Sequence, residues 1–487
     1  MPLNAAELLV TLGEQPHASL RVRLAGALRG SIRNGQIASG TTLPSTRVLA
    51  QDLGVSRGVV VDAYAQLAAE GFIRGRPGAS TTVVHTPPAE LPVRWREEAP
   101  PPAPPPGLDL RPGWPDLAAF PRQEWARAAR DVLRDLPDAE LGYCEPWGPR
   151  ELRRQLASYL ARVRGAMTAP DGVVVVSGVT QGLTLLSRVL LARGQRRLAV
   201  EDPSNAIQRQ LLSRLGVSVA DVPVDESGLR VDLLAASGTR TVLCTPAHQY
   251  PSGVVLSPAR REQLLRWAGD VGELIIEDDY DAEFRYERSP LSCLQGMDPE
   301  HVALLGSVSK TLAPALRIGW VVTPPHLLPA LRGLKRDDDF GSNGLDQHVL
   351  ARLMESGRYD RHLRGLRRRY RQRRNAFIAV LARRLPDWQV LESAGGLNVI
   401  VALPPDVPER RLVAAARRLG LWVLGLEVMS GHQTARPGIV VSYARMTPDM
   451  SEDAVARRSR AMNVMHDVTP ELEAAAASTA HLWEDVG

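Results

Sequence analysis

Ser307-Val308-Ser309-Lys310 follows the short apolar run Ala303–Leu305, and Arg317 comes seven residues after the lysine. Lysine occurs only twice in the 487 residues, at Lys310 and Lys335, which leaves 57 arginines among the 59 basic residues. Because arginine stays protonated in proteins, chemistry that needs a free primary amine must use one of these lysines or the chain terminus. We expect Lys335, which precedes an arginine and an aspartate, to be an ordinary exposed cation.

Two motifs upstream of Lys310 carry further polar groups. Ser177-Gly178-Val179-Thr180-Gln181 is predicted to leave a strand and open a helix, where backbone N–H groups and the helix dipole favour a phosphate. A turn of this kind can also carry Gly and Thr for its shape alone. Asp278 and Tyr280 follow the apolar run Leu274–Glu277, and an extended chain would point both side chains the same way. They could equally form a buried structural pair.

Short apolar runs alternate with amphipathic helical stretches through the second part of the chain. This pattern predicts an α/β fold with a largely parallel sheet and a ligand site near the carboxyl ends of its strands. The predicted strands are Val173–Val176, Leu198–Glu201, Thr241–Cys244, Leu274–Glu277, Ala303–Leu305 and Ile318–Val322.

Pyridoxal 5′-phosphate needs an amine for a Schiff base, an anion facing the ring nitrogen, a donor to the phenolic oxygen and a phosphate cradle. Lys310 can supply the amine, Asp278 the anion and Tyr280 the donor. The residues that can form the cradle are Val179, Thr180, Ser307 and Arg317. In order and spacing, this set resembles the fold-type I aminotransferases, which implies a large domain with a small α+β subdomain.

The resemblance implies roles for four more residues. Arg445, in Val441-Ser442-Tyr443-Ala444-Arg445, matches the arginine that grips the ligand carboxylate. Tyr143 matches a tyrosine that reaches the cofactor phosphate of the neighbouring subunit, which implies a homodimer. Asn205 takes the cofactor-site position where a tyrosine usually packs on the ring, a contact worth ~1 kcal/mol. Asn398 stands where a histidine is common. Weaker cofactor binding is therefore expected.

A proline series from Pro87 to Pro106 separates two units, because it can form neither a helix nor an inner strand. We expect a DNA-binding domain at 1–84, a Pro-rich linker at 85–107, a sensor domain at 108–470 and a flexible tail at 471–487.

The first unit is predicted to contain three helices and a basic-tipped hairpin, the pattern of a winged helix-turn-helix. Leu24, Leu28 and Ile32 mark the first helix. A second helix follows Pro44-Ser45, and Ser56 begins a third with the stripe Val60, Ala63, Tyr64 and Leu67. The run from Leu43 to Ile73 resembles the GntR family, which implies DNA contacts by Arg47, Ser56, Arg57 and Arg76. Alternatively, Ser56 only caps its helix and the arginines are solvated.

Together the two units resemble the MocR-type regulators, in which a GntR-like DNA binder is fused to an aminotransferase-like sensor. The resemblance implies transcription regulation, with promoter DNA and an amino compound or pyridoxal phosphate as partners. A catalytically active aminotransferase with an accessory DNA-binding domain is the alternative, since the residues needed for transamination are present. A third hypothesis is a DNA-binding protein whose sensor has lost its cofactor.

Composition limits the remaining classes of protein. The net charge of +5 is too small over this length to indicate DNA binding by itself. The three cysteines are isolated, so we expect no metal site and no disulfide framework. No apolar run approaches the ~20 residues of a membrane span, and we expect a cytoplasmic protein that does not contact the membrane. The arginine run from Arg364 to Arg374 is interpreted as a solvated helix face rather than a second DNA patch.

Overall fold

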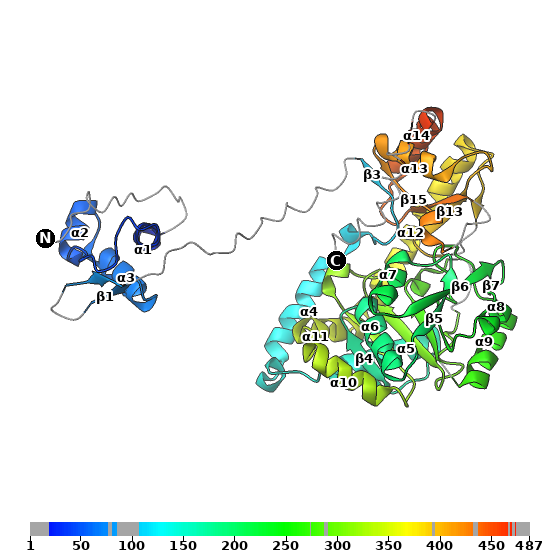
Figure 1. The fold of residues 1–487 in the computed structure, drawn as a ribbon, viewed down its shortest axis with the longest axis horizontal. Coiled ribbons are helices and arrows are strands. Elements are labelled where there is room, and N and C mark those ends of the chain that lie inside the picture. Colours follow the sequence, from blue (N-terminus) through cyan, green and yellow to red (C-terminus); the bar gives the residue numbers. More distant parts are fainter. Residues whose placement is uncertain are drawn as a thin grey trace. The chain divides into compact units, whose positions relative to one another are not determined.

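The computed structural model describes residues 19–75, 80–84, 107–272, 274–286, 291–391, 395–431, 437–465, 468–469 and Glu473. The chain forms two compact units, residues 1–100 and 101–487, and each is described by itself (Figure 1). Apart from residue 107 and Glu473, the predicted linker and tail lie outside the described residues.

Three helices and a two-stranded hairpin make up the first unit. They are α1 (Leu20–Arg33), α2 (Thr46–Leu53), α3 (Arg57–Ala69), β1 (Ile73–Arg74) and β2 (Thr82–Val83). Gly54 ends α2 with a φ of 63°, in the left-handed region that favours glycine, and so turns the chain toward α3. The predicted apolar stripes of α1 and α3 form the core of this unit. The winged helix-turn-helix prediction is confirmed.

An eight-stranded sheet forms the centre of the second unit, in the order β4-β11-β10-β9-β8-β5-β6-β7. Its strands are parallel except for β11 and β7. They are β4 (Val173–Val176), β5 (Arg197–Asp202), β6 (Ser218–Asp225), β7 (Gly228–Leu229), β8 (Thr241–Cys244), β9 (Leu274–Asp279), β10 (Val302–Ser307) and β11 (Gly319–Val322). All six predicted strands are present, with ends within two residues of the prediction.

The sequence did not predict β6 and β7. β6 contains Asp221, Pro223 and Asp225, and near the sheet edge it needs no continuous apolar run. β7 has only two residues, too few for any periodicity.

Helices cover both faces of the central sheet. They are α4 (Arg122–Asp135), α5 (Arg150–Arg164), α6 (Val179–Ala192), α7 (Ala206–Arg214), α8 (Val231–Ala236), α9 (Pro258–Val271), α10 (Leu328–Asp339) and α11 (Gly344–Glu355). Val173 and Val175 belong to a core cluster with residues of α5 and α11, whereas Val174 and Val176 belong to one with residues of α6. Burial on both faces explains why β4 is an unbroken run of valines.

The 27-residue helix α12 (Arg358–Arg384) leads into a small α+β subdomain. Its four-stranded antiparallel sheet has the order β12-β13-β16-β15. The remaining elements are β12 (Val390–Leu391), β13 (Asn398–Ala402), α13 (Glu409–Arg418), β14 (Leu421–Trp422), β15 (Leu424–Gly425), β16 (Gly438–Ser442) and α14 (Pro448–Val464). Short 3-10 helices lie at Leu117–Ala119 (η1), Asp138–Leu141, Pro170–Gly172, Ala282–Phe284, Pro314–Leu316 and Glu427–Met429.

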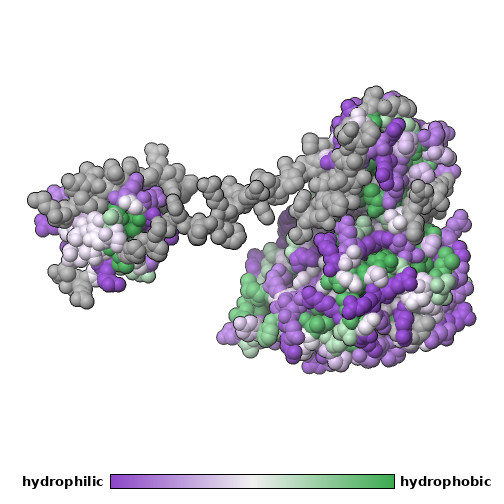
Figure 2. Space-filling view, in the orientation of Figure 1, coloured by the Kyte–Doolittle hydropathy of each residue, from purple (hydrophilic) through white to green (hydrophobic). Residues whose placement is uncertain are grey.

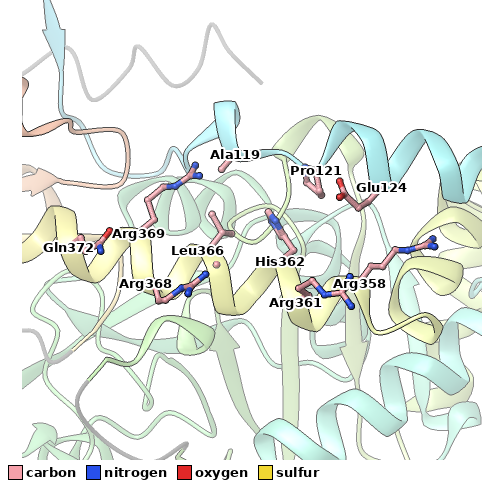
Figure 3. Close-up of a pocket in the computed structure, with 11 residues that line it drawn as sticks. Ala119, Pro121, Glu124, Arg358, Arg361, His362, Leu366, Arg368, Arg369 and Gln372 are labelled. Carbon is pink, nitrogen blue, oxygen red and sulfur yellow. The ribbon is translucent and has the colours of Figure 1, made fainter.

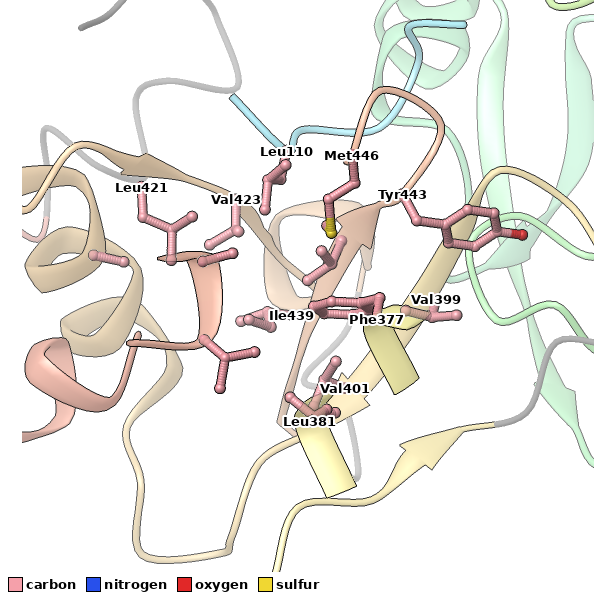
Figure 4. Close-up of a cluster of buried hydrophobic side chains, with 14 of the residues drawn as sticks. Leu110, Phe377, Leu381, Val399, Val401, Leu421, Val423, Ile439, Tyr443 and Met446 are labelled. Atoms are coloured by element: carbon pink, nitrogen blue, oxygen red, sulfur yellow. The ribbon is translucent and has the colours of Figure 1, made fainter. Parts of the chain in front are cut away.

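The core of the subdomain fixes the segment that enters the second unit. β3 (Leu108–Asp109) pairs in parallel with β14, and Leu110 lies in the apolar cluster beside Val423 and Met446 (Figure 4). Phe377 of α12 joins the same cluster. The chain after β3 is therefore held against the subdomain before it continues toward the central sheet.

The visible surface of the second unit is mostly hydrophilic, with apolar residues scattered between the polar ones (Figure 2). Among the described residues, no helix has both the length and the apolar character that crossing a membrane requires.

Candidate functional site

The predicted cofactor residues lie at strand ends and in the loops that follow. β9 and β10 are parallel neighbours, with Asp278 opposite Leu305. Asp278 lies near the carboxyl end of β9, and the loop after β10 carries Lys310. The electrostatic coupling between the Asp278 carboxyl and the Lys310 ammonium, which affects the pKa of each, shows that the fold brings this pair together.

Asp278 is 6% exposed, and its two oxygens have different surroundings. Oδ2 accepts a hydrogen bond of 2.6 Å from Nε2 of Gln208. Oδ1 is buried with no hydrogen-bond partner among the described residues. Burial raises the pKa of Asp278 to about 6, although the Gln208 hydrogen bond and the positive charge of Lys310 oppose this rise. A buried acceptor without a donor is costly, so Oδ1 is suited to a donor from a ligand.

The Lys310 amine is partly buried, and Nζ donates to the backbone oxygen of Gly113 at 2.6 Å. Burial lowers its pKa, whereas the negative charge of Asp278 raises it. A lysine with a lowered pKa is more often neutral and therefore more nucleophilic. The Gly113 contact is one that the sequence did not reveal, since 197 residues separate the two groups.

The turn between β4 and α6 has the geometry of an anion site. Gly178 has a φ of 88° and precedes Val179 and Thr180, the first two residues of α6. Because the first turn of a helix leaves its N–H groups without helical partners, these two amides are available to a phosphate. Arg317 donates from its guanidinium to the backbone oxygen of Ser177 at 2.5 Å, which places a positive charge at the same turn.

Glycine is required at position 178. A β-carbon there would lie 3.0 Å from a guanidinium nitrogen of Arg317, and the positive φ disfavours other residues. Ser307, the last residue of β10, accepts a hydrogen bond on Oγ from the Ser309 amide at 3.3 Å.

Tyr280 follows β9 directly, and its hydroxyl lies 2.8 Å from Nδ1 of His248. The same nitrogen is 3.0 Å from the Asp281 carboxylate. The ring of Tyr250 packs edge-on against Tyr280, with centroids 5.5 Å apart. Burial raises the pKa of the Tyr280 phenol well above its ordinary value, so the group keeps its proton and can donate. No local pattern in the sequence indicated the contact between Tyr280 and His248, which are 32 residues apart.

Asn205 and Tyr143 have different environments. The Asn205 side chain accepts from the Ile207 amide at 3.0 Å and caps α7. Tyr143 is 92% exposed and touches Phe340 edge-on, with ring centroids 5.6 Å apart.

Arg445 contacts the segment that enters the second unit. Its guanidinium donates to the backbone oxygen of Asp109 at 2.7 Å and lies 3.5 Å from the Asp109 carboxylate. Asp109 is also paired with Arg111 at 2.9 Å. Nε of Arg445 is buried with no partner among the described residues. Asn398 likewise has a buried side-chain oxygen, Oδ1, without a partner in the described part of the chain.

Lys335 corrects a prediction. The sequence indicated an exposed cation, but the Lys335 side chain is 0% exposed. Nζ donates to both carboxylate oxygens of Asp339, at 2.5 and 2.6 Å, and to Ser342 Oγ at 3.1 Å. Ser342 Oγ in turn lies 3.0 Å from Ser177 Oγ beside the anion turn. The i, i+4 carboxylate compensates the buried charge, which the sequence pattern did not reveal.

The first unit exposes three of its predicted DNA-contacting residues. Arg47, Ser56 and Arg57 are exposed at the starts of α2 and α3. Ser56 holds the N-cap position, but its side chain makes no capping hydrogen bond, and Ser45 caps α2 instead. Nε of Arg57 reaches Oγ1 of Thr46 at 3.4 Å. Arg76 lies outside the described residues.

The residues present fit pyridoxal phosphate. The unpartnered Asp278 oxygen suits a protonated ring nitrogen, Lys310 offers an amine, and the α6 amides with Arg317 suit a phosphate. A winged helix-turn-helix and a fold-type I aminotransferase-like domain in one chain define the class: a DNA-binding regulator with an aminotransferase-like domain.

Comparison with known proteins identifies the family. Residues 109–480 match the family "Aminotransferase class I and II", and residues 20–83 match "Bacterial regulatory proteins, gntR family". The chain is 34% identical to the HTH-type pyridoxine biosynthesis transcriptional regulator PdxR of Corynebacterium glutamicum, over 94% of this chain and 99% of that protein. It is 30% identical to the probable rhizopine catabolism regulatory protein MocR of Rhizobium meliloti, over 92% and 94%. The chain therefore belongs to the MocR-like, GntR-type transcription regulators.

Solved structures match the second unit. The multiple substrate aminotransferase of Thermococcus profundus superposes with a TM-score of 0.68 at 26% identity, covering 74% of this chain and 92% of the enzyme. The α-aminoadipate aminotransferase LysN of Thermus thermophilus, complexed with a phosphopyridoxyl-leucine adduct, gives 0.67 at 25% identity, covering 74% and 94%. The fold-type I prediction is confirmed.

Proposed function

We propose that this regulator binds promoter DNA through residues 1–84 and senses an amino compound, or pyridoxal phosphate itself, through residues 108–470. In this proposal residues 85–107 are a linker and residues 471–487 a flexible tail. One observation carries the sensing role: a buried carboxylate oxygen of Asp278 lacks a partner among the described residues, and the same carboxylate is electrostatically coupled to Lys310.

Each predicted cofactor residue has a separate role in holding the cofactor. Asp278 holds the proton of the ring nitrogen, Tyr280 donates to the phenolic oxygen, and Lys310 supplies the amine. The phosphate is held by the residues at the anion turn and beside it, namely Val179, Thr180, Ser307 and Arg317. When bound, the cofactor supplies an aldehyde that can form a reversible covalent bond with a primary amine.

Arg445 is proposed to hold the carboxylate of an amino ligand. Its unpartnered Nε and its contact with the Asp109 backbone support this role, because a carboxylate there would compete for the guanidinium. Binding of the ligand carboxylate would then release the segment around Asp109. Lys310 holds the same segment by its hydrogen bond to the backbone oxygen of Gly113. A ligand that displaces both contacts favours a second arrangement of this segment.

Tyr143 and Asn205 complete the proposed site. A tyrosine that is 92% exposed on one chain is available to the neighbouring subunit, which supports a homodimer in which Tyr143 reaches the partner's cofactor phosphate. Asn205 is proposed to lie beside the cofactor ring without stacking on it, since its side chain is engaged in capping α7.

DNA contact is assigned to Arg47, Ser56, Arg57 and Arg76. The exposure of the first three at the starts of α2 and α3 supports this assignment, and the open Ser56 hydroxyl is available to a phosphate or base. A regulator that acts on chromosomal promoters would work in the cytoplasm.

The named pathways of the relatives differ, so they support a small-molecule effector without fixing which one. A working aminotransferase is not favoured, because the regulators match the chain over both units. Turnover of amino donors with 2-oxoglutarate over many cycles would reverse that preference.

The test is a gel shift with promoter fragments at physiological salt, repeated with pyridoxal phosphate and candidate amines. Specific binding that the small molecules alter is the expected result. Arg57→Ala should lower the slope of log affinity against log salt by about one. Arg29→Ala is the matched control, because Arg29 is paired with Glu70 at 2.7 Å. No specific shift at any cofactor concentration would overturn the proposal.

A further inference from the structure

A basic groove lies between α12 and the segment Ala119–Glu124. It has a volume of about 560 Å³. Arg369 and His362 extend from α12 toward this segment (Figure 3). The arginine run of α12 was predicted to be a solvated helix face. In the structure, its arginines fall into two groups with different contacts.

Some arginines of α12 point inward and have structural partners. Arg367 donates to the backbone oxygen of Glu283, and Arg373 donates to that of Ala444. Arg374 is buried with its guanidinium 5.2 Å from the centre of the Tyr286 ring. These side chains support the interior and are not available to a ligand.

The outward-facing arginines differ. Among the described residues, none of them forms an ion pair: Arg358, Arg361, Arg364, Arg368 and Arg371. Arg369 is the exception on this side, since it pairs with Asp116 at 2.9 Å. Glu124 is the one acidic residue that lines the groove. The groove therefore holds a surplus of positive charge.

His362 does not add to this charge at neutral pH. Its Nε2 lies 2.7 Å from the backbone oxygen of Thr311, and burial, together with the positive charge of Arg369, lowers its pKa. The positive potential therefore comes from arginine, which keeps its charge throughout the physiological range.

The outward-facing arginines of α12 repel one another when no anion is bound to them. Arg361, Arg364, Arg368 and Arg371 are spaced by three or four residues and so lie on one face of α12, where neighbouring like charges repel each other. Asp360 is the one acidic residue of α12, and its carboxylate is paired with Arg162 at 2.7 Å, so it offsets little of this repulsion. A polyanion would offset it.

The row also has a suitable length. Arg361 and Arg371 are ten residue steps apart, a rise of about 15 Å along the helix at 1.5 Å per step. Successive phosphates of one DNA strand are about 3.4 Å apart along the duplex axis, and the strand winds around that axis, so a straight row of this length can reach a few phosphates. Planar guanidinium groups also match phosphate oxygens in bidentate geometry.

We propose that the outward arginines of α12 and the adjoining groove bind the sugar-phosphate backbone of DNA, without sequence preference and in addition to the winged helix. This inference rests on the proposed function, since it assumes that the regulator engages DNA. It assigns to the aminotransferase-like domain a DNA contact of its own, which would lengthen the stretch of DNA that the regulator occupies.

The experiment compares full-length wild type with Arg361→Ala/Arg368→Ala on a short operator duplex and on the same operator with long flanks. The expected result is several-fold weaker binding to the long duplex alone and a salt slope smaller by roughly two per protomer. Arg383→Ala/Arg384→Ala, at the other end of α12, is the matched control because those arginines contact Glu452. This control should bind like wild type.

The outcomes separate the two proposals. Specific binding that is identical in wild type and the groove variant overturns the groove assignment alone. Absence of DNA binding by wild type overturns both. If light scattering shows that the groove variant has lost its oligomeric state, the groove is a contact between copies of this chain, and the DNA assignment fails.

Discussion

Gln208 donates from Nε2 to Oδ2 of Asp278 at 2.6 Å and leaves Oδ1 buried without a partner among the described residues. Gln208 lies on α7 and Asp278 on β9, 70 residues apart. The hydrogen bond fixes the orientation of the carboxylate and stabilises its charged form, which burial disfavours. Gln208 is therefore a positioning residue for the group that would face the cofactor nitrogen.

Gln208→Leu removes this donor, so the pKa of Asp278 should rise from about 6 and the carboxylate should be protonated near neutral pH. A hydrogen bond to a charged group contributes ~1.5–3 kcal/mol, so cofactor affinity should fall about tenfold or more. Absorbance titration with pyridoxal phosphate between pH 6 and 8.5 measures this. Loss of binding on acidification should begin at higher pH in the variant.

Gln210→Leu is the control for that variant. Gln210 lies on the same helix, and in the described structure its side chain makes no hydrogen bond to the site. Equal affinity of wild type and Gln208→Leu for pyridoxal phosphate at every pH would show that Gln208 has no positioning role.

Lys310→Arg keeps the charge and removes the reactive amine. The variant should lose the visible absorbance of covalently bound cofactor, while Lys335→Arg should keep it. Since the chain has only these two lysines, the pair of spectra assigns the attachment site. Retained absorbance in Lys310→Arg would show that Lys310 is not the attachment site.

Lys335→Met should destabilise the second unit by about 1–3 kcal/mol, because it removes the ion-pair partner of Asp339, a carboxylate that is 25% exposed. Urea unfolding followed by circular dichroism measures the change. Arg336→Met, at an exposed neighbouring position, should stay within about 0.5 kcal/mol of wild type. A stability of Lys335→Met equal to that of wild type would mean that the pair contributes little.

The buried carboxyl group of Glu201 should make the free energy of unfolding depend on pH. Burial raises its pKa from the ordinary 4.5 to about 7, although Thr245 donates to it twice. Between these two pKa values the folded state binds one proton more than the unfolded state. The contribution of protonated Glu201 to stability is therefore full below about pH 4.5 and is lost as the pH rises through about 7.

Glu201→Gln cannot ionise, so its free energy of unfolding should improve relative to wild type between pH 5 and pH 8. Each pKa unit corresponds to about 1.4 kcal/mol, which limits the gain to a few kcal/mol. Glu226→Gln, at an exposed position, controls for the loss of one carboxylate. A constant difference between Glu201→Gln and wild type across this range would refute the assignment.

Both folds and most strands of the central sheet could be predicted from sequence patterns alone. Local patterns were sufficient where burial is continuous, as in the valines of β4, or where a stripe recurs with the helix period, as on α3. The sequence also selected Lys310, because composition left only two lysines. The sequence did not predict β6, the strand next to the sheet edge, because its aspartates and proline break the apolar pattern.

The contacts between distant side chains became visible only in the folded chain. Gln208 and Asp278, His248 and Tyr280, and Lys310 and Gly113 are joined across long stretches of chain that no local period relates. Lys335 was predicted to be exposed because the packing that buries its side chain comes from residues distant in the sequence. In α12, identical arginines became buried supports or an outward basic row according to what the rest of the fold packs against each one. Periodicity indicates a face of a helix, but the neighbours of that face are fixed only by the folded chain.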